Sequence, residues 1–222
     1  MKKKIVVIIP ARKGSKRIKN KNVRLFNGKP LIEWTIIAAK KSKFVDEIYI
    51  TTNDEEVKVI AKKNKIKIIN RPKHLANSFI MPDYAIKHAY LQISKDFDYI
   101  IMLHPTSPLR TSENIDNAVK DIINSKADSL LSVHEESPFL WKKRKSFYHS
   151  INYNFKKRPR SQNFKILREN GAVYVTKPEI YIKYNNRLGG KIFISKMNYL
   201  NSIDINTEED FIISEKLMRS FI

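Results

Sequence analysis

The sequence predicts an α/β fold with a mostly parallel sheet and helices on both faces, and two observations lead to this prediction. Short apolar runs rich in β-branched residues alternate with longer segments of helical period along the first 133 residues. The chain of 222 residues, with 42% hydrophobic and 29% charged residues, is also long and apolar enough to bury one sizeable core. Strands that alternate with helices are joined by right-handed crossovers, which make neighbouring strands parallel.

The predicted strands of the first half are short runs of apolar, mostly β-branched residues. They span residues 5–9, 47–51, 67–69, 99–103 and 129–133. The predicted helices between them span residues 30–41, 54–63, 81–94 and 112–125. Pro30 and Pro82 suit first helical turns, where a missing backbone N–H does no harm, and Asn53 or Asp54 is expected to cap the second helix. This order of elements favours a Rossmann-like sheet.

The alternation breaks between residues 135 and 168, where aromatic and basic residues occur without a helical period. We interpret this segment as an inserted, β-rich arm or lid. The earlier pattern then returns, with strands predicted at residues 171–176 and 191–194 and a last helix at residues 208–218 capped by Thr207. We therefore expect residues 1–134 and 169–222 to form one α/β domain, into which the arm of residues 135–168 is inserted.

The composition excludes several classes of protein. The chain has no cysteine, which excludes disulfide scaffolds, zinc–thiolate sites, iron–sulfur clusters and thiol nucleophiles, and fits a reducing cytoplasm. The first residues look like the start of a signal peptide, but the apolar run stops at Pro10 and charged residues follow at once. No stretch approaches the roughly twenty apolar residues of a membrane span. We expect an unprocessed cytoplasmic protein without a membrane partner.

The charge is strongly positive, since 43 Lys and Arg residues against 22 Asp and Glu residues give a formal net charge of +21. Such a charge attracts anions at long range and raises nucleic acid as a partner. The lysines are scattered along the chain, often as pairs such as Lys40 and Lys41, and no confined basic arm or tail occurs. A solvated, Lys-rich surface therefore explains most of the excess, and we expect no nucleic-acid partner.

Polar clusters follow three of the predicted strands at their carboxyl ends, where open parallel sheets bind ligands. They lie at residues 10–22, 51–54 and 104–110. In the first cluster Gly14 permits a tight turn, and Arg12, Lys16 and Lys21 are placed to meet on a polyphosphate, whose negative charges cations neutralise. With one glycine, this loop is neither a P-loop nor the dinucleotide fingerprint. A solvated basic loop fits the spacing equally well.

Five short motifs follow one another along the chain. They are the loop Pro-Ala-Arg-Lys-Gly-Ser-Lys from Pro10 with Lys21-Asn22, Arg71-Pro72 with Leu75-Ala76, His104-Pro-Thr-Ser-Pro-Leu-Arg110, Arg160 with Arg168-Glu-Asn-Gly-Ala-Val-Tyr174, and Ser202-Ile-Asp204. Together they resemble the motifs of the acylneuraminate (sialic acid) cytidylyltransferases. The resemblance covers residues 5–218, and five motifs in the same order make it specific.

The resemblance implies a nucleotide-diphospho-sugar transferase type of fold and a reaction in which CTP and a nine-carbon acidic sugar give a CMP-sugar and pyrophosphate. The anomeric hydroxyl attacks the α-phosphate of CTP. This step needs alignment, charge neutralisation and a divalent cation, Mg²⁺ or Mn²⁺, more than a covalent nucleophile. The resemblance also implies a homodimer, formed through the arm of residues 135–168, which reaches towards the partner's sugar site.

The resemblance also assigns roles to residues of this chain. The implied catalytic residues are Arg12, Lys21 and Asp204. The implied nucleotide-binding residues are Arg12, Ser15, Lys21, Asn22, Arg71 and Ala76. The implied sugar-binding residues are His104, Thr106, Ser107, Arg160, Asn170 and Tyr174. The implied metal ligands are Asp204 and Asn206. For Asn170 and Tyr174 the alternative is a pair of polar groups satisfied inside the core.

Two positions depart from the family pattern. Asn206 stands where the family usually has a second Asp, so a metal ion would meet one carboxylate fewer. His104 stands where sialic acid enzymes often have Gln, which is consistent either with a changed sugar, such as legionaminic or pseudaminic acid, or with neutral drift.

Three alternative functions stay open. The first is a 3-deoxy-manno-octulosonate cytidylyltransferase, which is disfavoured because that family has Lys-Pro in place of Lys21-Asn22. The others are a basic nucleic-acid-binding protein and an inactive relative kept as a binding module.

Overall fold

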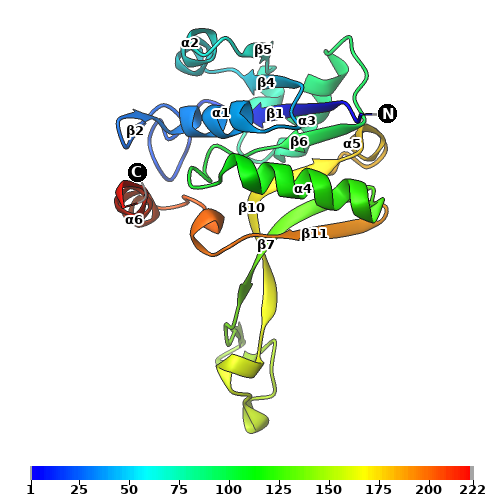
Figure 1. The fold of residues 1–222 in the computed structure, drawn as a ribbon. Helices are drawn as coiled ribbons and strands as arrows, with labels where there is room; N and C mark the ends of the chain where they lie inside the picture. The colour runs from blue at the N-terminus through cyan, green and yellow to red at the C-terminus, as the bar shows by residue number, and fades with distance from the viewer. Residues whose placement is uncertain (1, 221–222) are drawn as a thin grey trace.

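A computed structural model describes residues 2–220 and confirms the predicted α/β fold with a mostly parallel sheet (Figure 1). Seven strands form the sheet in the order β11-β7-β10-β6-β1-β4-β5. Their bounds are β1 (Ile5–Pro10), β4 (Glu47–Thr52), β5 (Lys67–Asn70), β6 (Tyr99–Met102), β7 (Ser129–Glu136), β10 (Ile166–Thr176) and β11 (Ile192–Lys196). Neighbouring strands are parallel except where β10 pairs with β6 and β7, to both of which it is antiparallel.

The helices lie close to their predicted positions, with two differences. Their bounds are α1 (Leu31–Lys41), α2 (Glu55–Lys63), α3 (Pro82–Leu91), α4 (Ser112–Ser125), α5 (Pro178–Tyr184) and α6 (Glu208–Arg219). The helix predicted at residues 81–94 ends at Leu91, because the N–H of Gln92 bonds the carbonyls of Ala89 and Tyr90 and closes the last turn early. The short helix α5 is absent from the sequence prediction. No helix in the described part of the chain is long and apolar enough to cross a membrane.

Both predicted helix caps near the site are present. The Asp54 side chain accepts a hydrogen bond from the N–H of Glu56 and so begins α2 directly after β4. Thr207 and Asp210 form a reciprocal capping box at the start of α6. Each cap fixes the direction in which the chain leaves the sheet, and therefore the position of the loop before the helix.

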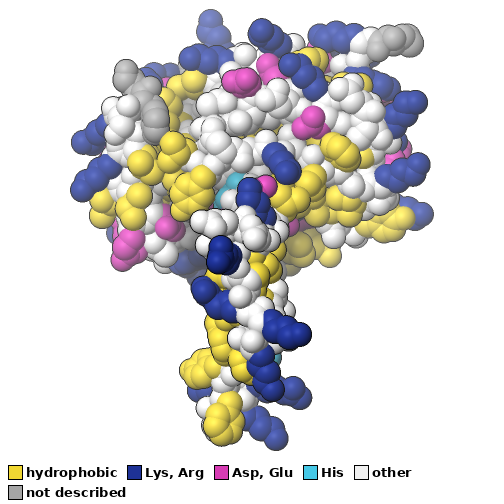
Figure 2. Space-filling view, turned by 60° about the horizontal axis from the view of Figure 1, so that its bottom comes forward, with side chains coloured by type: hydrophobic (Ala, Val, Ile, Leu, Met, Phe, Trp, Pro, Cys, Tyr) yellow, Lys and Arg dark blue, Asp and Glu magenta, His cyan; other side chains and the backbone are white. Residues whose placement is uncertain are grey.

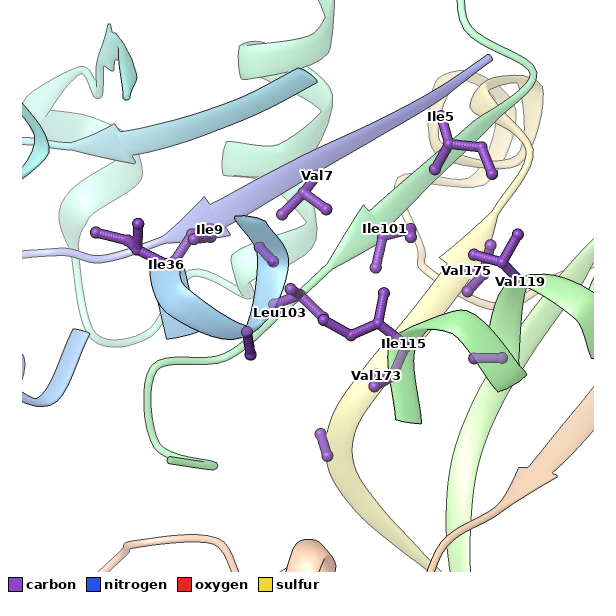
Figure 3. Close-up of a cluster of buried hydrophobic side chains, with 14 of the residues drawn as sticks. Ile5, Val7, Ile9, Ile36, Ile101, Leu103, Ile115, Val119, Val173 and Val175 are labelled. Atoms are coloured by element: carbon purple, nitrogen blue, oxygen red, sulfur yellow. The ribbon is translucent and has the colours of Figure 1, made fainter. Parts of the chain in front are cut away.

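Two apolar cores hold the layers together. Successive residues of β1 point to opposite faces of the sheet. Val6 and Ile8 pack in the core beneath α3 and α5. Ile5, Val7 and Ile9 pack in the larger core beneath α1 and α4, on the opposite face (Figure 3). All five side chains are fully buried, which explains why β1 is apolar at every position and not at alternate ones.

A third, smaller core lies at the end of the molecule where α6 meets the short hairpin of β2 (Leu25–Phe26) and β3 (Lys29–Pro30). Phe26 and Phe211 meet edge to face, with ring centroids 5.3 Å apart. Ile18, from the loop after β1, and Ile205, from the loop before α6, are fully buried in the same cluster. This core therefore holds two polar loops against each other.

Residues 135–168 project from the sheet as an arm (Figure 1). β7 and β10 continue to pair at its base, where Ile166 lies opposite Glu136, and the hairpin of β8 (Trp141–Arg144) and β9 (Phe147–Ser150) follows. Short turns η2 (Phe155–Lys157) and η3 (Ser161–Asn163) complete it. The strand predicted at residues 171–176 thus begins five residues earlier, at Ile166, with a register shift between Glu169 and Tyr174.

Candidate functional site

Four loops and the beginning of β10 gather at one edge of the sheet. Because β1, β4, β6 and β11 run in the same direction, the loops that follow them all leave at this edge. β10 runs the opposite way, so its first residues lie there too; Tyr174 pairs with Met102, the last residue of β6. The strand directions therefore bring residues near positions 12, 53, 104, 170 and 204 to one place.

A cleft of about 410 Å³ opens at this edge, which we call the cationic cleft. Its lining comes from the loop after β1, the loop before α3 and the loop after β6. Five cationic side chains line it, and none of the described residues in its wall is acidic. The five are Arg12, Lys16, Arg17, Lys21 and Arg71. Cations gathered without carboxylates in a concave site attract a polyanion.

The loop after β1 is shaped by one glycine and braced by Arg12. Gly14 has a φ of 80°, in the left-handed region that favours glycine. Across this turn the Arg12 Nη1 donates hydrogen bonds to the carbonyls of Gly14, at 2.7 Å, and Lys13, at 3.2 Å. The side chain of Asn22 donates to the carbonyl of Arg12 at 3.2 Å. Hydrogen bonds within the loop therefore hold its conformation, while the basic side chains of Lys13, Lys16 and Arg17 are exposed, as in the solvated basic loop that is the alternative from the sequence.

Arg71 is a buried cation whose guanidinium meets only neutral partners. Its Nε donates to the carbonyl of Leu75 at 2.8 Å, and it forms no ion pair within residues 2–220. Burial, with a contribution from the charge of Arg12, lowers the pKa of Arg71 to about 10. At neutral pH it stays charged, so its desolvated charge is available to an incoming anion. Arg71 is therefore a buried cation and not one of the dispersed surface cations.

A second hollow of about 550 Å³ lies at the same edge, and we call it the acidic hollow. The carboxylates of Glu169, Asp204 and Asp210 line it. The Nδ2 of Asn206 donates to the Oδ2 of Asp204 at 2.6 Å. Asp210 is engaged in the cap of α6, where its Oδ2 accepts the backbone N–H groups of Asn206 and Thr207, each at 2.8 Å. Asp210 is thus engaged by a helix cap and Glu169 by the hydroxyl of Tyr174, whereas Asp204 accepts from the Asn206 amide.

Lys21 and Arg17 connect the cationic cleft to the acidic hollow. The Nζ of Lys21 donates to the carbonyl of Ile205 at 2.7 Å, and Arg17 Nη1 donates to Oδ1 of Asn206 at 3.0 Å. Burial lowers the pKa of Lys21, and the carboxylate of Asp204 partly opposes that effect. The two hollows therefore form one composite site with a basic half and an acidic half.

The acidic half has the donor chemistry of a weak magnesium site. Within residues 2–220, no group of three or more His, Cys, Asp or Glu side chains is placed to hold a metal ion. Mg²⁺ in phosphate-binding sites commonly uses one or two carboxylates and takes its remaining ligands from the phosphates and water. Asp204 fits that pattern. The Oδ1 of Asn206 already accepts from Arg17, so a metal ion would either share this oxygen with Arg17 or displace it.

His104 lines the cationic cleft as a neutral ring. Burial, helped by the charges of Arg187 and Arg110, lowers the pKa of His104 to about 3. Tyr174 lies beside it edge to face, with ring centroids 6.2 Å apart. The hydroxyl of Tyr174 donates to Glu169, and burial followed by this hydrogen bond raises its pKa. Both rings are therefore uncharged near neutral pH.

The structure brings together most of the predicted site residues. Seven line the cationic cleft: Arg12, Ser15, Lys21, Asn22, Arg71, His104 and Thr106. Four line the acidic hollow: Asn170, Tyr174, Asp204 and Asn206. Three line neither hollow: Ala76 is half-buried in η1 (Lys73–Ala76), Ser107 is fully buried, and Arg160 is exposed on the arm.

Asn170 fits its structural alternative as well as its predicted role. Its Oδ1 accepts from the hydroxyl of Ser132 at 2.5 Å and from the N–H of Ala172 at 3.1 Å, and its Nδ2 donates to Ser202 at 2.9 Å. The amide is thus satisfied within the fold. Through these hydrogen bonds the Asn170 side chain connects β10, where its pairing register shifts, to β7 and to the loop before α6.

Two residues of the site escaped the sequence prediction. Arg187 contacts His104 from the loop after α5, and Asp83, at the start of α3, pairs with Arg187. Nothing in the sequence around Arg187 distinguishes it from the rest of the 43 Lys and Arg residues. Asp83 is an Asp that this chain retains from the family pattern, but the resemblance assigns it no role in the site. Only the tertiary fold brings the two together.

Comparison with known proteins agrees with this geometry. A family model described as cytidylyltransferase matches residues 6–217. The N-acylneuraminate cytidylyltransferase of Escherichia coli O18:K1:H7 is 31% identical over 216 residues, which are 95% of this chain and 51% of that protein. The CMP-N,N'-diacetyllegionaminic acid synthase of Legionella pneumophila is 33% identical over 229 residues, 97% of this chain and 96% of that protein. The chain thus spans about half of the first relative and nearly all of the second.

Solved structures share the fold at low sequence identity. CMP:2-keto-3-deoxy-manno-octonic acid synthetase in complex with CTP matches with a TM-score of 0.78 and 17% identity, over 99% of this chain and 100% of that one. A 4-diphosphocytidyl-2C-methyl-D-erythritol synthase from Anaerococcus prevotii matches with a TM-score of 0.68 and 14% identity, over 99% of this chain and 100% of that one. At such identities the likeness concerns the fold alone.

Proposed function

Because the chain belongs to the cytidylyltransferase family, we propose that it transfers CMP from CTP to the anomeric hydroxyl of a nine-carbon acidic sugar and releases pyrophosphate. One observation carries the proposal. A cleft lined by five cations lies beside an acidic hollow, and Arg17 of the cleft donates a hydrogen bond to Asn206 of the hollow. A nucleoside triphosphate and a divalent cation are the ligand pair that such a composite site fits.

The proposed chemistry is a displacement at phosphorus. The sugar hydroxyl oxygen forms a bond to the α-phosphorus and gives up its proton to water, the bond from phosphorus to the bridging oxygen breaks, and pyrophosphate leaves. Negative charge spreads over the phosphate oxygens as this happens, so fixed cations lower the barrier. In our proposal Arg12 and Lys21 supply those charges, and the buried Arg71 fixes the nucleotide end. CTP is a nucleotide of the cytoplasm, where we place the reaction.

We propose Mg²⁺ or Mn²⁺ as the cofactor, held by Asp204 together with phosphate oxygens. When bound, the ion would act as a Lewis acid on the phosphates. Asp204 contributes the one carboxylate of the acidic half that caps no helix and bonds an amide in place of a cation. Asn206 offers a second, uncharged oxygen, which the ion would share with Arg17 or take from it.

For the sugar we propose an acylated nonulosonic acid of the sialic or legionaminic type. The Legionella relative, which this chain matches over nearly its whole length, is named for a diacetylated legionaminic acid. His104, where sialic acid enzymes often have Gln, is consistent with the legionaminic member of this pair. The fold likeness to the octonic acid synthetase does not favour an eight-carbon sugar over these, because it is a likeness of fold at 17% identity.

A pyrophosphate-release assay tests the proposed function. The full chain is incubated with Mg²⁺, one nucleotide from CTP, UTP, ATP and GTP, and one acid from sialic, legionaminic, pseudaminic and 3-deoxy-manno-octulosonic acid. We expect release with CTP and a nine-carbon acid only. Turnover with none of the acids would remove the proposal, and release with the eight-carbon acid alone would replace it.

Replacing Arg12 by alanine tests the cationic cleft. We expect kcat/KM for CTP to fall more than about tenfold, a loss of roughly 1.4 kcal/mol of transition-state stabilisation. The side chain is half-buried and braces only its own turn, so thermal stability should change little. Exchange of Lys19, an exposed cation outside the cleft lining, is the matched control. A near-normal kcat/KM for Arg12→Ala would remove this residue from the site.

We also propose a two-fold homodimer formed through the arm. Hydrophobic and basic side chains share the visible face of the arm, without acidic ones (Figure 2). Trp141, Phe147, Tyr148 and Phe155 are each at least half exposed in the single chain. Aromatic residues at such density are typical of interface cores. Arg160 lies on the same arm and lines neither hollow of its own chain, so a sugar-binding role requires that it act on the partner's site.

Co-expression of two inactive variants tests this arrangement. Arg160→Ala and Asp204→Ala chains are tagged differently and their mixed dimer is purified. If Arg160 acts in trans, one of the two sites in each mixed dimer is intact, and we expect roughly half the wild-type activity per dimer. If Arg160 acts within its own chain, each site carries one lesion and the mixed dimer is as inactive as its parents. A monomer in light scattering would also contradict the proposal.

A further inference from the structure

A chain of buried contacts runs beneath the cationic cleft and ends at His104. Asp83 is fully buried and Arg187 is nearly so. The Nε of Arg187 donates to Oδ1 of Asp83 at 3.0 Å, its Nη2 to Oδ2 at 2.5 Å, and its backbone N–H to Oδ1 at 2.7 Å. The third guanidinium nitrogen, Nη1, lies 3.3 Å from Nε2 of His104.

The orientation of Arg187 is fixed by two neighbours, Asp83 and Tyr174. The paired hydrogen bonds to Asp83 hold the plane of the guanidinium. The face of the group lies over the ring of Tyr174, with 4.8 Å between the guanidinium carbon and the ring centroid. Tyr174 in turn packs edge to face on His104. Nη1 therefore points at His104 because of the rest of the cluster, and not because of His104 alone.

This contact determines which nitrogen of His104 carries its hydrogen. A guanidinium has donors and no acceptor, so Nε2 must accept and cannot hold a hydrogen. The hydrogen of the neutral ring then lies on Nδ1. Burial and the neighbouring arginine charges lower the pKa of His104 to about 3, so the doubly protonated ring is unpopulated near neutral pH. The ring has one available tautomer.

The remaining nitrogen has no partner within the described part of the fold. Within residues 2–220, Nδ1 of His104 makes no hydrogen bond and is not one of the fully enclosed unpartnered atoms. His104 lines the cationic cleft, and of its two ring nitrogens Nδ1 is the one left free to meet a ligand there. The cleft thus offers a fixed hydrogen-bond donor at this point. An oxygen acceptor on a substrate can meet it, whereas an ammonium group cannot, and the surrounding cations repel an ammonium further.

We propose that Arg187, anchored by Asp83, is a positioning residue that holds His104 as a hydrogen-bond donor. The site then selects a sugar that presents a hydroxyl or an amide carbonyl oxygen to His104. It rejects a sugar that presents a free amine there. The proposal deepens the proposed sugar transfer and rests on it for the identity of the ligand. The tautomer of His104 does not depend on any ligand, so the two claims fail separately.

Nitrogen NMR of the full chain labelled at histidine nitrogens tests the tautomer directly. Long-range nitrogen–hydrogen correlations distinguish a protonated Nδ1 from a protonated Nε2, and the spectrum of His104→Gln assigns the ring. We expect the Nδ1–H tautomer in the wild type, unchanged between pH 8 and pH 5. In Arg187→Met we expect a mixture of the two tautomers, because the contact that excludes a hydrogen from Nε2 is gone. An Nε2–H ring in the wild type, or an Arg187→Met spectrum like the wild type, would overturn the proposal.

Steady-state kinetics provide a second test, that of the donor role of His104. In Arg187→Met we expect KM for the acid sugar to rise at least about tenfold, the size of one good hydrogen bond, with KM for CTP within twofold. His104→Gln keeps a neutral donor and should retain most of the sugar affinity, whereas His104→Leu should lose it. Equal loss in the Gln and Leu variants would contradict the donor role. Should Arg187→Met fail to fold, Arg187→Lys is measured instead, with the same direction and a smaller size of effect expected.

Discussion

Replacing Asp204 by alanine is expected to lower kcat/KM at least about a hundredfold, or roughly 2.7 kcal/mol of transition-state stabilisation. In our proposal Asp204 is the one carboxylate of the site that holds the divalent cation, since Asp210 is engaged in capping α6. The expected loss is large because no third acidic or histidine ligand is placed to compensate within the described residues. The measurement is steady-state pyrophosphate release over a range of Mg²⁺ concentrations.

The neighbouring position supplies the matched control. Asn206→Asp introduces a second carboxylate beside the first, and we expect it to preserve activity and to lower the Mg²⁺ concentration needed for half-maximal rate. The thermal midpoint of Asp204→Ala should stay within a few degrees of wild type, since the residue is half-buried in a loop. An Asp204→Ala enzyme with more than a tenth of wild-type activity would refute the metal role.

Replacing Asp83 by asparagine is expected to destabilise the protein by about 3 kcal/mol or more. The substitution removes the only ion-pair partner that the described residues give to Arg187, and leaves a desolvated guanidinium against a neutral amide. Removing one half of a buried pair costs more than the pair itself contributes, because the surviving charge is uncompensated. Urea unfolding followed by circular dichroism measures the change.

A double-mutant cycle with Arg187→Met separates the ion pair from its surroundings. If the penalty arises from an unpaired charge, Asp83→Asn should cost far less in the Arg187→Met background than in the wild type. Additive effects would show that Asp83 acts mainly through its hydrogen bond to the backbone N–H of residue 187. A change below 1 kcal/mol for Asp83→Asn would contradict a buried ion pair altogether.

Local patterns predict most of the sheet and its helices. β1 is recognisable because it is buried on both faces and so is apolar at each position, and α2 and α6 begin where Asp54 and Thr207 can cap them. β10 is only half predictable. Its first residues leave the domain and form the base of the arm, where exposed Arg168 and Glu169 give no strand signal. Helix α5 is too short to show a period.

The candidate site likewise has residues that the sequence predicts and residues that it does not. Arg12, Lys21 and Asp204 belong to motifs, and the directions of the strands explain why they meet at one edge. Arg187 belongs to no motif and lies in a short loop, so its place beside His104 is decided entirely by tertiary contacts. The satisfaction of Asn170 inside the fold is likewise invisible in the sequence, because the hydroxyls of Ser132 and Ser202 that bond it come from distant segments.

The structure shows where part of the net charge of +21 lies. Five of the cations line a single cleft that has room for a nucleotide, and Arg71 is buried there without a carboxylate. Several others pair with surface carboxylates, as Lys67 and Lys95 do with Glu47, where exposed pairs contribute little to stability. A small anionic substrate accounts for the clustered cations, and the dispersed lysines give no reason to add a nucleic acid.

The most direct test of the proposed function is the identity of the product. CTP, Mg²⁺, the full chain and an acylated nonulosonic acid labelled with ¹³C at its anomeric carbon are followed by ³¹P NMR. We predict that one phosphodiester signal, coupled to the labelled carbon, grows in step with pyrophosphate while CTP disappears. CTP that stays intact with every nine-carbon acid, or that yields free CMP with no coupled signal, would contradict the proposed transfer.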